Sequence, residues 1–371
     1  MTALEQLSWH YENRLAQAKQ AAAKGALVAG VTSNTVPWEL LRAAGFFPVL
    51  LSPPPGPALF AERYMEDVFD ARIRGIFHGL ASGEWPFLKV AVVPRTSEQE
   101  HKLYLYLREV ARQGLAAACP RVFLYNLLHT RTEESHAYGL ARTRELLGQL
   151  ELVAGSKVTH ATLCDAIEEG NRARRALARL LKLRDETRIS GSEALPLTGA
   201  YYFLDRGGFA GLLEEATAEL SARPALEGPR LLLKGAPLDH PALHRAIESQ
   251  GAVVAAEDDW WGSRSLTPEI STDGDLVENV YRVYYSGTPS PRSFPAANAD
   301  RWFLEAAGHV HGVVFYLPPE DDIIGWDYPR LRDWLDARRI PQLLIRSDAR
   351  ELSAEEHQRI AEFVSGIGRT R

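Results

Sequence analysis

The feature that most constrains the fold of this 371-residue chain is a regular alternation of short apolar segments with amphipathic segments. Each apolar segment is continuous, and the segment that follows it carries apolar residues at helical spacing. Short, continuous apolar strands that each precede a helix are typical of parallel sheets covered by helices on both faces. The alternation therefore predicts an α/β fold.

The alternation occurs in two sets. The predicted strands lie within residues 25–33, 47–51, 89–95 and 121–127, and within residues 229–237, 252–259, 311–318 and 341–348. A long helical stretch from Thr159 to Glu186 and a helix near residues 209–222 separate the two sets. Between those helices, the segment Ser190–Thr198 breaks the pattern with Gly, Ser and Pro. We therefore expect two Rossmann-like (flavodoxin-like) domains, residues 1–190 with a long helical extension and residues 191–371, joined by a helical middle segment.

Charge and hydropathy argue against two classes of partner. The formal net charge of −6 gives no reason to expect nucleic acid. The arginine-rich stretch 171–188 alternates with Ala and Leu at helical spacing, which indicates a solvated helix face. Apolar runs such as "ALVAGV" are far too short to span a bilayer, and residues 1–20 predict an amphipathic helix without the apolar core of a signal peptide. We expect a soluble, cytoplasmic protein.

Local motifs argue against several kinds of chemistry. Cys119 and Cys164 are the only cysteines, and neither has a Cys or His partner nearby in the sequence. They cannot by themselves ligate an iron–sulfur cluster or a structural zinc ion, so we interpret both as buried bystanders. The chain has no G-x-G-x-x-G or P-loop sequence, so nucleotide binding has no direct support. It also has no G-x-S-x-G elbow and no H-E-x-x-H pair.

Candidate functional residues follow the strands, because ligands of open α/β sheets bind at the carboxyl ends of the strands. Ser33 and Asn34 follow the first strand and precede a helix. They fit an ordinary helix N-cap, and they also fit a site where a hydroxyl and backbone N–H groups hold a ligand oxygen. Glu39 lies in the first turns of that helix, where complementing the helix dipole is favoured over acid–base chemistry. His129, after the fourth strand, is either structural or an acid or base.

Two strand ends in the second half carry aromatic and acidic residues. Trp260 and Trp261 follow the sixth strand, and the alternation of strand faces indicates that at least one indole lines the site. Asp321 and Asp322 follow the seventh strand. Two adjacent carboxylates there could hold a metal, act as an acid or base, or cap the next helix.

The chain resembles the 2-hydroxyacyl-CoA dehydratases and benzoyl-CoA reductases, in the class of subunits that form the catalytic heterodimer. The resemblance covers nearly the whole chain, and the order and spacing of its segments carry it. The segments are "SNTVPWELLRAAGFFPVLL" (33–51), "IEEGNRARRALARLL" (167–181), "PRLLLKGAPLDHPALHRAIESQGAVVAAEDDWWGSR" (229–264) and "HGVVFYLPPEDDIIGWDYPRLRDWLDARRIPQLLIRSD" (311–348). It implies two Rossmann-like domains, an interdomain cleft for an acyl-CoA, and a [4Fe-4S] cluster that takes single electrons from an ATP-dependent activator.

The chain departs from this family pattern where the pattern places cluster cysteines. The family usually has Cys-Asp in place of Asp321-Asp322 and again at Ser97, and a third cysteine falls near Asp70. A cysteine of some relatives is replaced by Trp260. Because iron–sulfur clusters need thiolate donors, we expect this chain to bind no cluster and no metal of its own. Polar residues filling a wet cavity are favoured at the former ligand positions Asp70, Ser97 and Asp321, and a hard oxygen site for Mg²⁺ or Mn²⁺ is the alternative.

The resemblance also implies roles for the strand-end residues. The family places a polar residue of the first loop near the substrate carbonyl, and Ser33 is the matching position, so Ser33 is the candidate catalytic residue. Asn34, Trp260, Trp261 and Arg264 are the candidate substrate-binding residues. The tryptophans would stack on an adenine or an aryl acyl group, or fill the volume of the lost cluster. Arg264 would pair with a CoA phosphate.

These observations predict a subunit or homologue of a dehydratase- or reductase-type complex that binds an acyl-CoA thioester. If active, it would act as a lyase or oxidoreductase within that complex. Its partner would be a second copy of the chain, or a cysteine-bearing relative that carries the [4Fe-4S] cluster, together with an ATP-dependent activator. The alternative is a stand-alone descendant, either a binding or interaction protein or an enzyme with a hard-metal site in the old cluster cavity.

Overall fold

The computed structural model describes residues 1–287, 294–295, 297–319, 321, 324–347 and 350–368. Its strands form two four-stranded sheets in which all paired strands are parallel. The first sheet has the order β2-β1-β3-β4 and the second has the order β6-β5-β7-β8. The strands are β1 Leu27–Val31, β2 Phe46–Leu50, β3 Val90–Pro94, β4 Arg121–Tyr125, β5 Arg230–Gly235, β6 Val253–Glu257, β7 Gly312–Tyr316 and β8 Gln342–Ile345. The predicted α/β fold with two Rossmann-like sheets is confirmed.

Each strand coincides with a predicted apolar run because helices cover both faces of each sheet. Every residue of β3 and β7 is buried, and β1 is buried in all but its first residue. A strand with no solvated face needs no polar side chains, so its sequence is continuously apolar.

The helices of the first half and the middle segment are α1 Ala3–Glu12, α2 Ala16–Ala23, α3 Trp38–Ala43, α4 Leu59–Tyr64, α5 Ala71–Ser82, α6 Glu98–Arg112, α7 Glu133–Ala154, α8 His160–Asp185, α9 Gly191–Gly199 and α10 Arg206–Ser221. Those of the second half are α11 Ala242–Glu248, α12 Leu276–Gly287, α13 Ala297–Ala307, α14 Ile324–Asp336 and α15 Ala354–Gly368. Short 3-10 turns cover Ala200–Tyr202 and Ser263–Ser265.

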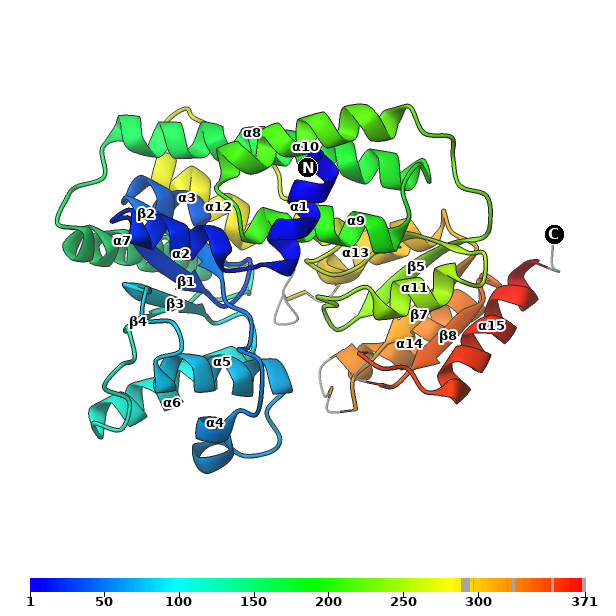
Figure 1. Ribbon diagram of the computed structural model, residues 1–371, viewed down its shortest axis with the longest axis horizontal. Helices are drawn as coiled ribbons and strands as arrows, with labels where there is room; N and C mark the ends of the chain where they lie inside the picture. Colours follow the sequence, from blue (N-terminus) through cyan, green and yellow to red (C-terminus); the bar gives the residue numbers. More distant parts are fainter. Residues whose placement is uncertain (288–293, 296, 320, 322–323, 348–349, 369–371) are drawn as a thin grey trace.

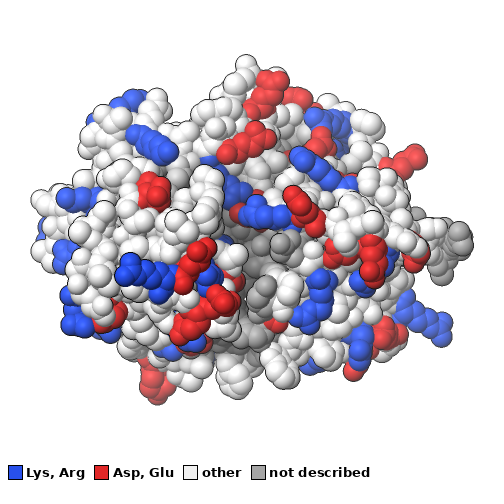
Figure 2. Space-filling view, turned by 60° about the horizontal axis from the view of Figure 1, so that its bottom comes forward, with Lys and Arg blue, Asp and Glu red and all other residues white. Residues whose placement is uncertain are grey.

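The long helices α8 and α10 pack side by side along one edge of the molecule and extend over both sheets (Figure 1). Helix α12, although late in the chain, packs against α7 and α8. Trp261 and Tyr281, which come from the second half, belong to the main hydrophobic core around the first sheet. The two halves therefore share buried surface. Between the two lobes the molecular surface is hollowed, and side chains of both charges border the hollow (Figure 2).

Two local predictions differ from the structure. The expected N-terminal helix is divided into α1 and α2, because Arg14 between them turns to the Asp239 carboxylate, 2.6 Å away. The segment expected to break the helical pattern forms α9, because Ser190 and Glu193 make a capping box and Ala194 and Leu195 are buried. The division of the chain at residue 190 stays a prediction.

No helix among the described residues is long and apolar enough to cross a membrane.

Candidate functional site

A group of hydroxyls lies at the carboxyl edge of the first sheet, where the strand order reverses. Because β1 is the neighbour of β3, the loops that follow these two strands meet. The Ser33 Oγ lies 2.9 Å from the Thr35 Oγ1, and the Thr35 Oγ1 lies 2.5 Å from the Thr96 Oγ1. A third contact of 3.4 Å joins Ser33 to Thr96. Ser33, Thr35 and Thr96 are called the hydroxyl cluster below.

A buried carboxyl group lies beneath the hydroxyl cluster. Glu100 comes from the first turn of α6, is 4% exposed, and accepts a hydrogen bond from the Thr32 Oγ1 at 3.1 Å. Burial raises the pKa of Glu100 above its ordinary value, although the nearby Arg72 charge and hydrogen bonds from Thr32 and Thr96 oppose the rise. Glu100 therefore holds its proton to a higher pH than an ordinary glutamate does.

Arg72, in the first turn of α5, connects this edge to the tryptophans of the second half. Its side chain is half-buried and donates a hydrogen bond to the carbonyl of Thr32, the residue before Ser33. Its guanidinium carbon lies 5.8 Å from the centroid of the Trp260 ring. Arg72 thus contacts both Trp260 and the loop that carries Ser33.

The two adjacent tryptophans stack on each other, with centroids 4.9 Å apart and ring planes 29° apart. Trp261 is 2% exposed and lies in the core, with Arg14 over its other face at 5.2 Å, whereas Trp260 is half-buried. The alternation of strand faces does not apply to this pair, because β6 ends before it at Glu257. Trp260 is the member of the pair that retains surface for a ligand.

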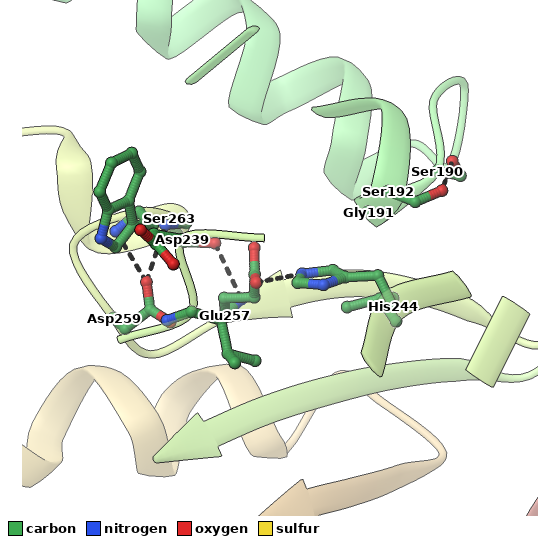
Figure 3. Close-up of polar contacts among 12 residues, drawn as sticks. Ser190, Gly191, Ser192, Asp239, His244, Glu257, Asp259 and Ser263 are labelled. Atoms are coloured by element: carbon green, nitrogen blue, oxygen red, sulfur yellow. Dashed lines mark hydrogen bonds and ion pairs between the residues drawn. The ribbon is translucent and has the colours of Figure 1, made fainter. Parts of the chain in front are cut away.

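Asp259 shapes the turn that carries the tryptophans (Figure 3). Its Oδ1 accepts hydrogen bonds from the backbone N–H groups of Trp261 at 2.7 Å and Gly262 at 3.0 Å. Burial, and then the negative charge of Glu257, raise the pKa of Asp259 to about 8. Asp259 thus has a structural role.

Glu257, at the end of β6, is fully buried and lies against His244 of α11 (Figure 3). Arg184 of α8 pairs with the same carboxylate. The Arg184 Nη1 lies 2.6 Å from the Glu257 Oε2, and Arg184 also donates to the carbonyl of Val254. Burial acts to raise the pKa of Glu257, but the charges of Arg184 and His244 and the hydrogen bonds from both together outweigh it, and the pKa falls below the ordinary range. This ion pair holds the middle segment against the second sheet.

Arg264 lines a cavity of about 530 Å³ between α8, the segment 263–269 and α13. Its Nη1 donates to the Asp258 Oδ1 at 3.1 Å, and its guanidinium carbon lies 5.3 Å from the centroid of the Trp302 ring. Asp258 also pairs with Lys234, so one carboxylate serves two cations. The corner carries an excess positive charge beside an open volume.

The remaining first-half candidates have structural partners. Asn34 is half-buried, and its side chain hydrogen-bonds Tyr202. Glu39 is 3% exposed and pairs with the buried Arg174, its Oε1 lying 2.6 Å from the Nη2. Burial acts to raise the pKa of Glu39, but the charge of Arg174 and the hydrogen bonds to the carboxylate together outweigh it, and the pKa is lowered. His129 is buried and hydrogen-bonds the backbone of Arg95, and burial lowers its pKa.

The three positions that the family resemblance assigns to cluster ligands each cap the N-terminus of a helix. Asp70 accepts from the Ile73 N–H at the start of α5 (2.7 Å), and Ser97 accepts from the Glu100 N–H at the start of α6 (3.2 Å). Asp321 accepts from the Ile324 N–H at the start of α14 (2.8 Å). Capping is one of the roles that the sequence left open for Asp321. Asp322 lies outside the described residues.

The donor set does not fit the iron–sulfur cluster that the family resemblance implies. Asp70, Ser97 and Asp321 offer oxygen rather than thiolate sulfur. Cys119 precedes β4 at the amino edge of the first sheet, opposite the hydroxyl cluster, and burial raises its pKa to about 11. Cys164 lies on α8. In the part of the chain that the structure describes, no group of three or more His, Cys, Asp or Glu side chains could hold a metal ion.

Several residues of this site were not singled out from the sequence. They are Thr32, Thr35, Arg72, Thr96 and Glu100. Thr35 and Thr96 carry a weak signal, since each closely follows a strand end. The sequence around Glu100 is misleading, because Ser97-x-x-Glu100 is the pattern of a solvated capping box. In the structure the Glu100 carboxyl group instead accepts a hydrogen bond from the buried Thr32 hydroxyl.

Comparison with known proteins agrees with the sequence resemblance. Residues 34–366 match the family model described as 2-hydroxyglutaryl-CoA dehydratase, D-component. The chain is 26% identical over 220 residues to the (R)-2-hydroxyglutaryl-CoA dehydratase subunit beta of Acidaminococcus fermentans, a match covering 55% of this chain and 57% of that protein. It is 23% identical over 218 residues to the (R)-phenyllactyl-CoA dehydratase beta subunit of Clostridium sporogenes, covering 56% and 57%. The matches thus span little more than half of each relative's length. Because the family model covers most of the chain, the chain belongs to the 2-hydroxyglutaryl-CoA dehydratase D-component family.

Proposed function

We propose that this chain binds an acyl-CoA thioester at the carboxyl edge of its first sheet, as a cluster-free subunit or homologue of a 2-hydroxyacyl-CoA dehydratase-type complex. The observation that carries the proposal is the hydroxyl cluster, which lies where open α/β sheets bind ligands. Family membership and the names of the relatives, which are subunits of CoA-ester dehydratases, support the class of ligand.

The hydroxyl cluster offers hydrogen-bond donors that suit the oxygen of a polarised carbonyl group. A thioester oxygen beside Ser33 would meet a hydroxyl donor, and the neighbouring Thr35 and Thr96 hydroxyls would orient that donor. The half-buried face of Trp260 would contact the acyl chain, and Arg264 in its cavity would pair with a CoA phosphate. These groups bind and orient the ligand, and the proposal assigns no bond-breaking step to them.

We also propose that any iron–sulfur cluster of the complex belongs to a partner. In the family such a cluster supplies one-electron chemistry. The oxygen donors at Asp70, Ser97 and Asp321 and the distant cysteines support its absence from this chain.

Thermal unfolding with and without ligand tests the binding proposal. Acetyl-CoA at about a hundred times its Kd would stabilise the fold by roughly 2.7 kcal/mol and raise the Tm by several degrees. Ser33→Ala should weaken acetyl-CoA more than free CoA, because only the thioester offers a carbonyl to the lost hydroxyl. Arg264→Ala should weaken both alike, because both carry the phosphates. Ser82→Ala, at the exposed far end of α5, is the matched control and should change neither.

If no CoA thioester shifts the Tm of the unmodified chain, the proposal fails, and the stand-alone interaction protein becomes the better description. If Ser33→Ala and Ser82→Ala behave alike while acetyl-CoA still binds, the ligand lies elsewhere than the hydroxyl cluster.

A further inference from the structure

The cavity beside Arg264 has three arginines in its wall. Its volume of about 530 Å³ lies within the range of about 300–1,000 Å³ that is typical of small-molecule pockets. Arg174, Arg175, Arg264, Thr267 and Trp302 line it, and these five residues define what is called the arginine cavity below. None of its described lining residues comes from the loops after β1 and β3, so the arginine cavity is a place separate from the hydroxyl cluster.

The ion pairs around the arginine cavity leave a positive charge uncompensated. The first two arginines each pair with one carboxylate. Arg264, however, shares the Asp258 carboxylate with Lys234, so these three side chains carry a net positive charge. The Arg264 side chain is only 13% exposed, and water therefore does little to stabilise the excess charge. An anionic ligand group would compensate it.

The polar groups of the arginine cavity have hydrogen-bond donors to spare. Arg264 donates to Asp258 through its Nη1, and its Nε and Nη2 have no partner among the described residues. The Thr267 hydroxyl accepts from the Arg174 Nε at 2.9 Å, so the hydroxyl proton is available to a ligand oxygen. A phosphate group combines several acceptor oxygens with negative charge, and a guanidinium can bind it through two parallel hydrogen bonds.

Another part of the cavity wall is apolar. Trp302 is half-buried, and the centroid of its ring lies 5.3 Å from the guanidinium carbon of Arg264. Leu266 and Pro268 add aliphatic surface. An indole face beside aliphatic groups suits a planar base. A planar base and a phosphate are the two parts of a nucleotide, and side chains that bind the phosphate make a glycine-rich loop unnecessary.

The turn after β6 leads from the arginine cavity to the tryptophan pair. The Arg264 N–H donates to the carbonyl of Asp259 at 3.0 Å, so residues 259–264 form one closed turn. Trp260 lies in this turn, and Arg72 connects Trp260 to the loop that carries Ser33. A long ligand with its thioester at the hydroxyl cluster and a nucleotide at its other end would follow this turn.

We propose that the arginine cavity holds the nucleotide end of the CoA ester, with the 3′-phosphate at Arg264 and Thr267 and the adenine against Trp302. A phosphate monoester carries about −1.5 to −2 charges near pH 7, so it compensates the excess positive charge better than a singly charged phosphate of the pyrophosphate bridge does. The chain therefore selects CoA over 3′-dephospho-CoA. This inference rests on the proposed function and adds to it a second site, which recognises the end of the ligand remote from the thioester.

Four ligands test the inference: acetyl-CoA, CoA, 3′-dephospho-CoA and adenosine 3′,5′-bisphosphate, which has the nucleotide without the thioester arm. Their Kd values are measured by isothermal titration calorimetry for the unmodified chain, for Arg264→Met and for Arg172→Met. Arg172 is the matched control, because it lies on α8 close to the arginine cavity in sequence but pairs with Glu214 of α10. Circular dichroism melting checks folding, and Arg264→Met leaves Asp258 paired with Lys234.

The unmodified chain should bind CoA roughly tenfold to a hundredfold more tightly than 3′-dephospho-CoA, the usual effect of charge-assisted hydrogen bonds. Adenosine 3′,5′-bisphosphate should bind by itself and compete with acetyl-CoA. Arg264→Met should abolish the preference for CoA and weaken adenosine 3′,5′-bisphosphate by the same factor, whereas Arg172→Met should keep both affinities. Trp302→Leu should weaken CoA and 3′-dephospho-CoA alike, because both carry the adenine.

Equal affinity of the unmodified chain for CoA and 3′-dephospho-CoA would overturn the inference and leave the proposed function standing. An equal loss in Arg264→Met and Arg172→Met would assign the preference to overall charge and also overturn it. Binding of adenosine 3′,5′-bisphosphate without binding of acetyl-CoA would overturn the proposed function and keep the nucleotide site. If none of the four ligands binds, both fail.

Discussion

At the scale of single residues, Glu100 shows how the fold changes the chemistry of an ordinary side chain. A glutamate in the first turn of a helix is usually solvated, and the helix dipole stabilises its negative charge. In this chain α6 follows β3, and β3 lies beside β1 in the sheet. The Glu100 carboxyl group is therefore buried, and it accepts a hydrogen bond from the hydroxyl of Thr32, which follows β1. Burial then favours the protonated form.

This burial predicts a pH dependence of stability. Because the folded-state pKa of Glu100 is raised, the folded chain binds more protons than the unfolded chain as the pH rises from about 4.3 to that higher pKa. The contribution of Glu100 to the free energy of unfolding therefore falls as the pH rises through this window. Glu100→Gln cannot titrate, so its stability relative to the unmodified chain should increase from pH 4 to pH 8.

Urea unfolding at a series of pH values measures this difference. Glu62→Gln, at an exposed position on α4, is the control and should stay parallel to the unmodified chain. Parallel curves for Glu100→Gln as well would mean that the pKa of Glu100 is not raised in the folded protein.

At the scale of elements, three of the helices with side-chain N-caps begin at the positions that the family resemblance assigns to cluster cysteines. Asp70, Ser97 and Asp321 start α5, α6 and α14, and each side-chain oxygen accepts a backbone N–H. A helix start at a strand end needs such an acceptor, because its first N–H groups have no partner within the helix. The positions that the family resemblance assigns to cluster cysteines therefore contribute to folding in this chain.

Removal of a cap should reduce stability by a modest and predictable amount. Asp321→Ala should lower the free energy of unfolding by about 0.5–2 kcal/mol, and Asp321→Asn should recover most of the loss, because an amide oxygen also caps. Asp333→Ala, at an exposed position on α14, is the control, and urea unfolding is the measurement. Stabilisation by Mg²⁺ or Mn²⁺ that depends on Asp321 would instead favour the hard-metal alternative.

At the scale of the whole molecule, the two sheets are held together by buried contacts from distant parts of the chain. Arg184 of the middle segment pairs with Glu257 at the end of β6, and Trp261 packs into the core around the first sheet. Removal of one partner of a buried ion pair leaves an uncompensated charge, so these contacts resist separation of the halves. These contacts therefore fix the position of the hydroxyl cluster relative to the turn that carries the tryptophans.

The assembly of the whole molecule gives the last prediction. We expect a homodimer of the isolated chain, or a heterodimer with a cysteine-bearing relative, by sedimentation at concentrations above roughly ten micromolar. Iron and acid-labile sulfide should remain with the relative after the two chains are separated. A monomer with no partner recovered from the source cell would contradict both forms of assembly, and stoichiometric iron and sulfide on this chain alone would contradict the absence of a cluster.

The sequence alone determined the strands, most of the helices, the parallel sheets and the family. These follow from local patterns, because a segment buried on both faces must be apolar whatever its neighbours are. It also predicted that functional residues lie in the loops after β1, β3, β4, β6 and β7. It did not predict α9, because capping by Ser190 and burial outweighed the Gly, Ser and Pro that suggested a break.

Only the tertiary structure decided which of these loop residues meet. Thr35 and Thr96 are 61 positions apart, and they come together because β1 lies beside β3. Arg72 reaches Trp260 because the turn after β6 stacks its tryptophans toward the first sheet. Burial of Glu100 likewise depends on neighbours from another strand. These groups come into contact because of the order of the strands in the sheet, and local sequence does not determine that order.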